Sequence, residues 1–269
     1  MNLCIYCFKK LKEKNKTKDH LFPKSWYPED TLLDLERWTV PACYKCNQKY
    51  GTIEDDLLLR IGICIDPNEN SAKGISEKAK NKFFYLSEID KRKAGRKDKN
   101  FEKIIKNLKK YVPNKTLKGM TPKADVRSEM AITIPNKYLL ALGKKIITGL
   151  EHICRQKLIN KGRITEIFYV YAEDNLENSY TKWSKLLNQN KININLGPAF
   201  KVEYGVDPKN ENTAIYHITI WNHFELWGWA YKPRLKRKIL LIYYKLKRYL
   251  RYKLNLSEGK PNDKDFNLG

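Results

Sequence analysis

The 269-residue chain has no long uninterrupted apolar run. Its longest candidate, residues 239–244, stands between lysines and arginines and falls far short of the roughly 20 apolar residues that span a bilayer. We therefore expect no integral membrane segment. The start, Met1-Asn2-Leu3-Cys4, also lacks the basic and apolar regions of a secretory signal peptide. We expect a cytoplasmic protein, in a reducing compartment that disfavours disulfides.

Acidic residues are too few to balance the basic ones, and 53 lysines and arginines against 30 acids give a net charge of +23. Nucleic acid, an anionic membrane surface and an acidic protein are all suitable partners on charge alone. The excess is concentrated, since residues 1–60 are nearly balanced while residues 91–123 hold 13 basic side chains and residues 232–253 hold 10 with no acid. Phosphate contacts should gather in these two blocks. A solvated basic face or a Lys-rich linker is the alternative.

The sequence has six cysteines, and four of them form two Cys-x-x-Cys pairs, Cys4/Cys7 and Cys43/Cys46. Two such pairs can hold one tetrahedral zinc ion through four thiolates, or form disulfides. The paired spacing favours structural zinc. The other two cysteines, at positions 64 and 154, lie in apolar helical patterns, where a small buried side chain is expected.

The segment between the two pairs carries a dense polar motif, Asp19-His20-Leu21-Phe22-Pro23-Lys24-Ser25. A short β-type run follows at residues 38–42, and Asn47 comes directly after the second pair, where a helix is expected to start. We expect this helix to break at Gly51, because Thr52 and Asp55 offer a new cap. The predicted order is the first Cys-x-x-Cys pair, a strand, a loop, a second strand, the second Cys-x-x-Cys pair and a helix.

These residues resemble the HNH endonuclease family, whose ββα-metal core shows Asp-His-x-x-Pro-x-Ser, then Val-Pro-x-Cys and Cys-x-x-Cys-Asn. The matching segments here are residues 19–25, 40–43 and 43–47, within about residues 4 to 60. The three segments together are a specific signature of the family, although any one of them alone would be weak evidence. The resemblance implies a zinc-stabilised ββα-metal nuclease domain.

The chemistry of such an enzyme requires a deprotonated water, a cation on the scissile phosphate and stabilisation of the leaving oxygen. Imidazole accepts a proton near neutral pH, so His20 is the predicted general base. The resemblance implies that Asp19 and Asn47 hold one divalent ion, and so few protein ligands suit Mg²⁺ or Mn²⁺. A noncatalytic zinc-containing nucleic-acid-binding protein is the alternative.

One position departs from the family pattern, because Trp38 stands where a middle Asn usually steadies the loop that carries the base. Asp34 or Glu36 could supply the missing contact. Three acids at positions 54–56 could add a metal ligand from the helix, but helix capping and surface solvation explain them more simply.

The fold class predicted for the whole chain is α+β. We divide it into an HNH domain at 1–65, a basic connector at 66–123, an α+β recognition or regulatory domain at 124–254 and a polar tail at 255–269. Helices are predicted at 135–160 and 176–188, and strands at 165–171, 200–204 and 214–224, with a turn at 207–212. The first of these helices buries one face, formed by Leu139, Leu142, Ile146, Leu150 and Ile153. A basic amphipathic helix at 233–254 could pack on this domain, form a dimer or lie on a membrane surface.

Aromatic residues crowd positions 221–231, where we expect core packing rather than a base-stacking platform. The histidines at 152, 217 and 223 are expected to be structural. The predicted function is cleavage of double-stranded DNA, suited to phage defence or restriction, with RNA left open and a homodimer or regulatory partner conceivable. The side chains predicted to contact nucleic acid are Lys24, Lys45, Lys49, Arg96, Lys97, Arg237, Lys238, Arg248 and Arg251.

Overall fold

The structure is a computed structural model of the whole chain. The residues that it describes are 3–82, 102, 105–106, 108–110, 130–132, 134–159, 164–169, 187, 191–222 and 224–232.

The N-terminal part is a two-stranded antiparallel ribbon followed directly by a long helix. In chain order its elements are the 3-10 turn η1 (Glu13–Asn15), β1 (Lys16–His20), the 3-10 turn η2 (Lys24–Trp26), β2 (Thr39–Cys43) and α1 (Tyr44–Gly62). Asp19 lies opposite Val40 and His20 opposite Thr39 in the ribbon. The predicted order of strand, loop, strand and helix is confirmed, as is the α+β class.

Helix α1 runs without interruption through Gly51, so the predicted break is wrong. A Cβ added at Gly51 would meet nothing within 4 Å, so this position faces open space. A glycine inside a helix costs only about 1 kcal/mol relative to alanine. The buried neighbours Tyr50, Ile53 and Leu57 hold the helix against the core, and this packing outweighs the local signal.

Small elements follow α1 in the chain, and α2 packs against its end. They are η3 (Asn70–Ala72), α2 (Ile75–Asn81) and a two-stranded antiparallel sheet of β3 (Leu108–Lys110) and β4 (Met130–Ile132). A Cβ at Gly62 would lie 2.7 Å from Cβ of Ala79. Glycine is therefore needed where α1 and α2 approach each other.

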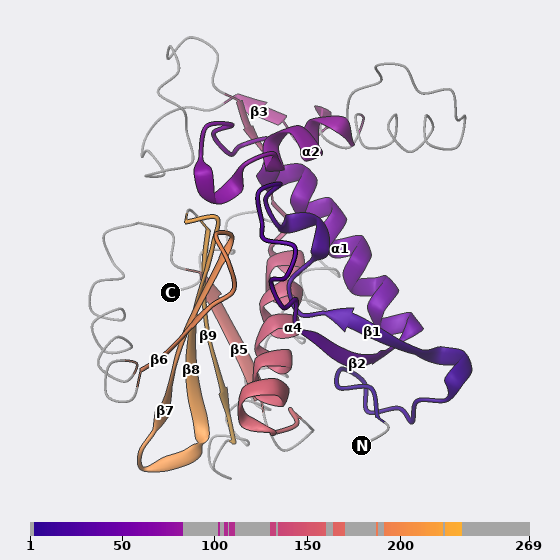
Figure 1. The fold of residues 1–269 in the computed structure, drawn as a ribbon, viewed down its shortest axis with the longest axis vertical. Helices are drawn as coiled ribbons and strands as arrows, with labels where there is room; N and C mark the ends of the chain where they lie inside the picture. Colours follow the sequence, from indigo (N-terminus) through magenta and orange to yellow (C-terminus); the bar gives the residue numbers. More distant parts are fainter. Residues whose placement is uncertain are drawn as a thin grey trace, which may run out of the picture. The chain divides into compact units, whose positions relative to one another are not determined.

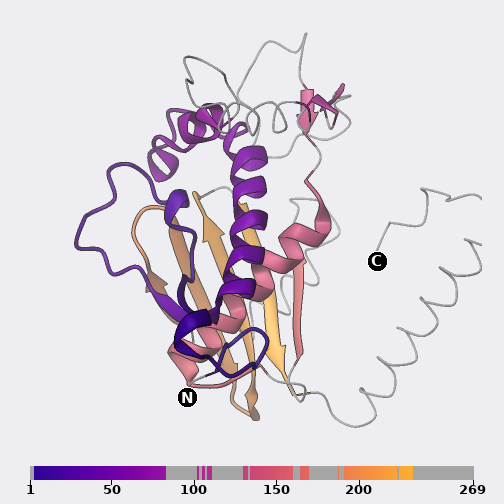
Figure 2. The same cartoon turned by 90° about the vertical axis from the view of Figure 1, so that its right-hand side faces the viewer.

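A five-stranded antiparallel sheet forms the second layer. Its strands are β5 (Ile164–Tyr169), β6 (Ile192–Asn195), β7 (Phe200–Asp207), β8 (Asn210–Ile220) and β9 (Phe224–Tyr231). Their order in space is β5-β9-β8-β7-β6. The helix α4 (Asn136–Arg155) crosses one face of this sheet and separates it from the β1–β2 ribbon (Figure 1), and the turned view shows the same layering (Figure 2).

Two tight turns connect the central strands. The turn predicted within residues 207–212 is confirmed, and it joins β7 to β8. A second turn, at Trp221 and Asn222, splits the run predicted at 214–224 into the end of β8 and the start of β9. Both of its residues have positive φ, 53° and 55°, and the pairing of Ile220 with Phe224 makes the connection three residues long.

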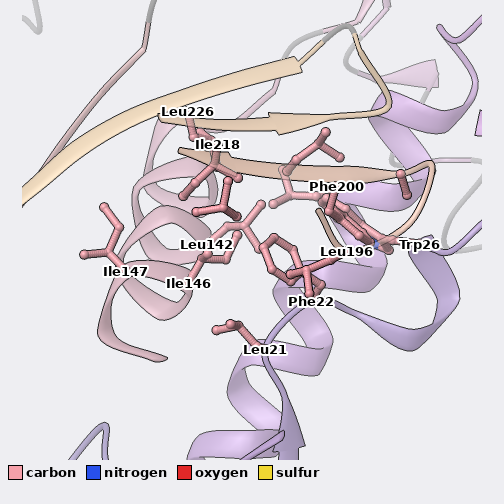
Figure 3. Close-up of a cluster of buried hydrophobic side chains, with 14 of the residues drawn as sticks. Leu21, Phe22, Trp26, Leu142, Ile146, Ile147, Leu196, Phe200, Ile218 and Leu226 are labelled. Carbon is pink, nitrogen blue, oxygen red and sulfur yellow. The ribbon is translucent and has the colours of Figure 1, made fainter. Parts of the chain in front are cut away.

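The ribbon, α4 and the sheet share one hydrophobic core (Figure 3). The rings of Phe22 and Phe200 lie 4.4 Å apart between centroids, and those of Trp26 and Trp221 lie 4.9 Å apart. Trp221 Nε1 also donates a hydrogen bond to the carbonyl oxygen of Trp26 at 2.8 Å. The expectation that the aromatics pack in the core is confirmed for the fully buried Trp221.

Helix α4 is buried on more than the one face that was predicted. Four residues of the predicted stripe are fully buried, and Ile153 is partly buried. On the ribbon side, a Cβ added at Gly149 would lie 2.3 Å from Leu21 Cδ1, and on the sheet side one added at Gly143 would lie 2.8 Å from Ile167 Cγ2. Glycines on both sides therefore let α4 fit between the two layers.

Some predicted elements lie outside the described residues. These are the helix at 176–188 apart from Leu187, the basic helix at 233–254 and the tail at 255–269. In the part of the chain that the structure describes, no helix is both long and apolar enough to cross a membrane.

Candidate active site

The two Cys-x-x-Cys pairs meet at one point. Cys4 and Cys7 lie in a tight turn closed by the hydrogen bond from Phe8 N to Cys4 O at 2.8 Å, while the other pair spans the junction of β2 and α1. The four sulfur atoms lie within 4.8 Å of one another. Sulfurs of a tetrahedral zinc–thiolate site are about 3.8 Å apart, given Zn–S bonds of about 2.3 Å, and Cys7 Sγ lies 3.7 Å from Cys43 Sγ. The cluster could bind zinc.

The thiols of the cluster differ in how readily they ionise. Burial raises the pKa of the Cys7 and Cys46 thiols, and neighbouring thiols raise that of Cys46 further. Burial opposes ionisation of Cys43 as well, but hydrogen bonds from the Cys46 backbone N–H and from the other thiols lower its pKa overall. Zinc binds thiolates, so a bound ion would have to displace the protons that burial favours on Cys7 and Cys46.

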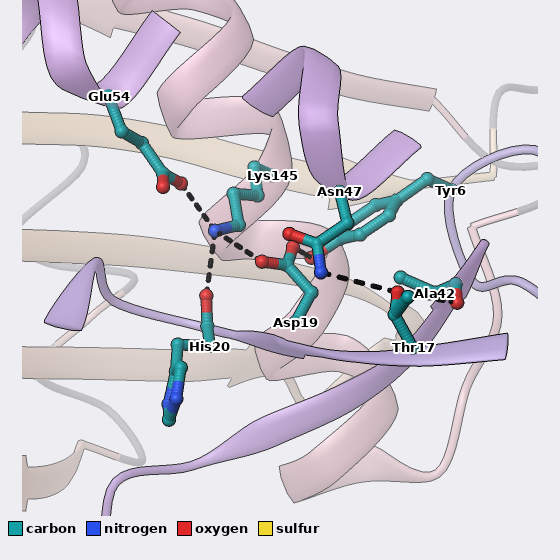
Figure 4. Close-up of polar contacts among 8 residues, drawn as sticks. All are labelled: Tyr6, Thr17, Asp19, His20, Ala42, Asn47, Glu54 and Lys145. Atoms are coloured by element: carbon teal, nitrogen blue, oxygen red, sulfur yellow. Dashed lines mark hydrogen bonds and ion pairs between the residues drawn. The ribbon is translucent and has the colours of Figure 1, made fainter. Parts of the chain in front are cut away.

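Strand β1 directs its last two side chains to opposite faces, as the alternation of a strand dictates. Asp19 points toward the interior and is only 4% exposed. The His20 imidazole lies on the other side of the strand (Figure 4). The exposed side chains of Lys16 and Lys18 alternate with Thr17 and Asp19, so they share the face of His20.

A buried lysine from α4 joins the Asp19 side of the ribbon. Lys145 is 0% exposed, and its Nζ donates to Asp19 Oδ1 at 3.2 Å, to the His20 carbonyl oxygen at 2.6 Å and to Glu54 Oε1. The other carboxylate oxygen of Asp19 accepts a hydrogen bond from the Tyr6 hydroxyl at 2.7 Å. Burial and the Asp19 charge raise the pKa of Tyr6 well above its usual value, so the hydroxyl stays protonated and remains a donor.

Glu54 is the acid of the 54–56 run that reaches this buried group. Burial raises its pKa, while the Lys145 ammonium opposes that shift. The other two acids of the run are engaged elsewhere, because Asp56 pairs with Arg60 at 2.8 Å and Asp55 pairs with Lys82. Glu54 therefore contacts the candidate site through Lys145, and its burial contradicts the surface solvation that the sequence favoured for it.

Asn47 lies beside Asp19 in the first part of α1 (Figure 4). Its Nδ2 donates to Thr17 Oγ1 at 3.2 Å, and Thr17 donates in turn to the Ala42 carbonyl oxygen at 2.9 Å. This pair of contacts fixes the carboxamide with its nitrogen toward the strand. The oxygen of Asn47 and the carboxylate of Asp19 are hard ligands of the kind that Mg²⁺ and Mn²⁺ prefer, so the residues fit a divalent ion.

His20 is partly exposed, and its ring is biased toward the neutral form. Burial lowers the pKa of His20, and the charges of Lys145, Lys24 and Arg37 lower it further against the opposing effect of Asp19. Its Nδ1 is buried and has no hydrogen-bond partner. In particular, neither Asp34 nor Glu36 contacts it among the described residues, so the contact suggested for them is not observed.

Arg37 is a site residue that sequence reasoning missed. Its guanidinium lies 5.1 Å from the centroid of the Tyr27 ring, and its Nε is buried without a hydrogen-bond partner. It is close enough to His20 for its charge to lower that pKa. No local motif marks this arginine, because it stands in the irregular segment before β2.

The side chains predicted to contact nucleic acid divide into two groups. Lys24, Lys45 and Lys49 are exposed on the N-terminal domain, and Lys24 lies near His20. The other six, in the two basic blocks, lie outside the described residues: Arg96, Lys97, Arg237, Lys238, Arg248 and Arg251.

His217 on the sheet belongs to a separate cluster. Its ring stacks on Trp227 with centroids 4.1 Å apart, and its nitrogens lie 2.9 Å from Glu203 and 3.2 Å from Glu225. Within the described ranges, the cysteine cluster is the one group of ligand-type residues arranged for a metal ion. The expectation that His217 is structural agrees with these contacts.

The model of the HNH endonuclease family matches residues 4–60. This segment contains the cysteine cluster, Asp19, His20 and Asn47 in the arrangement described above. The N-terminal domain is an HNH endonuclease domain. Searches of curated proteins and of solved structures found no match to the chain. The HNH match ends before α4, so Lys145 comes from outside the HNH domain.

Proposed function

We propose that the HNH domain is a metal-dependent endonuclease that hydrolyses phosphodiester bonds of DNA. The observation that carries the proposal is that Asn47 contacts Thr17 on the same face of β1 as Asp19, in the strand that ends in His20 and inside the segment that matches the family. The four-cysteine cluster would hold a structural zinc ion. Its binding energy, of order 10–16 kcal/mol in zinc-finger peptides, would stabilise a domain with a small core of its own.

Asp19 and Asn47 would hold the catalytic Mg²⁺ or Mn²⁺. The buried charges favour this, since the carboxylates of Asp19 and Glu54 outnumber the single ammonium of Lys145. A bound divalent ion would supply positive charge to the scissile phosphate and to the leaving oxygen. Each Asp19 oxygen already accepts one hydrogen bond, and a carboxylate oxygen has a second lone pair for a metal.

His20 would accept the proton of the attacking water. A general base must be unprotonated at working pH, and the lowered pKa keeps the imidazole neutral near pH 7. Because the ring and the Asp19 carboxylate lie on opposite sides of β1, the scissile phosphate must sit at the end of the strand, where His20 is the last residue. Lys24 and Arg37, whose charges act on His20, are suited to bind the same phosphate.

DNA is the proposed substrate because the chain combines this domain with a net charge of +23. Lys45 and Lys49 extend the basic surface of the domain along α1. Each phosphate that such a side chain neutralises releases counterions. The slope of the logarithm of the binding constant against the logarithm of salt concentration then becomes steeper by roughly 0.9. Tight binding at low salt that weakens steeply with salt is expected.

The test is incubation of zinc-loaded protein with supercoiled plasmid and with single-stranded RNA, with Mg²⁺, with Mn²⁺ and without either ion. We expect nicked or linear plasmid only when the divalent ion is present. Asn47→Ala should raise the metal concentration needed for half-maximal cleavage, whereas Gln48→Ala, which changes the exposed neighbouring amide, should not. DNA binding without any cleavage would favour the noncatalytic alternative, and cleavage of RNA alone would reassign the substrate.

A further inference from the structure

We infer that Lys145 is a positioning residue that completes the HNH site from outside the HNH domain. It would fix the Asp19–His20 segment, and with it the metal ligand and the base. The inference rests on the proposed function for its catalytic consequence. Its structural part, that Lys145 restrains this segment, is tested separately below.

The three contacts of Lys145 use all three protons of the ammonium group. Two of them go to consecutive residues, the Asp19 carboxylate and the His20 carbonyl oxygen, and the third goes to Glu54 (Figure 4). The carbonyl oxygen of His20 carries no formal charge, so the 2.6 Å hydrogen bond that it accepts from Lys145 does not neutralise one. Its effect is to hold the backbone at the residue that carries the base.

Charge balance is the competing explanation for a buried lysine. Glu54 alone would make an ion pair with Lys145, and removal of one partner of a buried pair is destabilising whatever else it does. A simple substitution of Lys145 therefore cannot separate the two roles. The separation requires a variant that keeps the net charge of the buried group and removes only the donors.

The surrounding packing fixes where the ammonium lies. Leu142 and Ile146 on α4 are fully buried in the shared core, and Gly149 lets the same helix touch Leu21, the residue after His20. Complete burial also immobilises the lysine stem, which is otherwise flexible. Lys145 thus connects a buried helix to the end of β1, and Lys145 and Asp19 are 126 positions apart in the chain.

The decisive variant combines Lys145→Met with Glu54→Gln. Wild type has two carboxylates and one ammonium in the group, and the double variant has the Asp19 carboxylate alone, so the net charge is unchanged. Lys144→Met is the matched control, because Lys144 is exposed on the same helix. All proteins are compared at equal zinc content, by amide hydrogen exchange of a peptide covering residues 16–26 and by single-turnover plasmid cleavage with Mg²⁺.

We expect amide exchange in the 16–26 peptide of the double variant to be about tenfold faster, as loss of a charge-assisted hydrogen bond implies. Cleavage should fall about 100-fold, the typical effect of a small misplacement of catalytic groups. The Lys144 control should match wild type in both assays. Unchanged exchange in the double variant would show that Lys145 only balances Glu54, and would overturn the inference.

Two further outcomes are also decided by this design. If wild type does not cleave, the proposed function fails, and the exchange experiment still decides whether Lys145 restrains the segment. If the double variant does not fold, Lys145→Gln with Glu54→Gln replaces it, because the amide can still donate hydrogen bonds at the same net charge. That variant should show intermediate protection and activity, and wild-type values in both would contradict a positioning role.

Discussion

The contact between Gly149 and Leu21 permits a sharp prediction about how α4 supports the site. Alanine at position 149 would place its Cβ 2.3 Å from Leu21 Cδ1, far inside a normal van der Waals contact. Leu21 is fully buried, so its side chain has little room to move. Either α4 or the chain segment next to His20 must therefore shift.

The magnitude follows from two opposing effects. Overpacking in a tight core typically costs 1–3 kcal/mol, and replacing a helical glycine by alanine regains about 1 kcal/mol. We expect Gly149→Ala to lower the free energy of unfolding by up to about 2 kcal/mol. Cleavage should fall by more than the loss of folded protein explains, because Leu21 directly follows His20, the proposed base.

Urea unfolding of four proteins tests this reasoning: wild type, Gly149→Ala, Leu21→Val and the double variant. Valine lacks the Cδ atoms, so Gly149→Ala should become neutral or stabilising in that background. Gly51→Ala is the control, since a Cβ there meets nothing within 4 Å and should stabilise by about 1 kcal/mol. If Gly149→Ala stabilises the protein like Gly51→Ala, the close packing of α4 on the ribbon is refuted.

Three further predictions concern other parts of the structure. Cys46→Ser should abolish binding of about one zinc per chain and lower the urea midpoint, measured by metal analysis and unfolding; retained zinc would contradict the four-thiolate site. Burial opposes protonation of His217, but Glu225 and Glu203 raise its pKa above 6.5, while His217 helps to lower theirs below 4.5. The cluster should therefore add most to the free energy of unfolding between about pH 4.5 and 6.5, and this contribution should be lost as pH rises through the raised His217 pKa. His217→Gln should lower the free energy of unfolding less at higher pH, and a loss that stays constant with pH would contradict this. Arg37→Gln should weaken DNA binding and reduce the salt slope by about 0.9, and an unchanged slope would exclude a phosphate contact.

The local features of the site could be predicted from the sequence. Two Cys-x-x-Cys pairs and an Asp-His-x-x-Pro motif fix ligand spacing within a few residues, and the structure gathers the four cysteines as expected. The α4 stripe and the turn between β7 and β8 were also predictable, because their signals are local periodicity and turn chemistry. The predicted break at Gly51 was wrong because tertiary packing of α1 overrides a weak local preference.

The long-range parts of the site could not be predicted in this way. Lys145 looks like a polar-face lysine of an amphipathic helix, and only the fold shows that it is 0% exposed against Asp19. Arg37 and Glu54 likewise acquire their roles from partners that are far away in the sequence or in another element. Strand β9 was missed as a separate strand because the Trp221–Asn222 turn carries no glycine to mark it.

The role of His20 as the general base is the central claim, and single-turnover plasmid cleavage by wild type and His20→Ala tests it most directly. Both proteins should be zinc-loaded and assayed with and without added Mg²⁺, omitting chelators that could remove zinc. His152→Ala, which removes a histidine of α4 outside the site, is the control. Loss of a general base should reduce the rate by about 10²–10⁴, with folding and zinc content unchanged and the control fully active. Equal cleavage rates for wild type and His20→Ala would contradict the account.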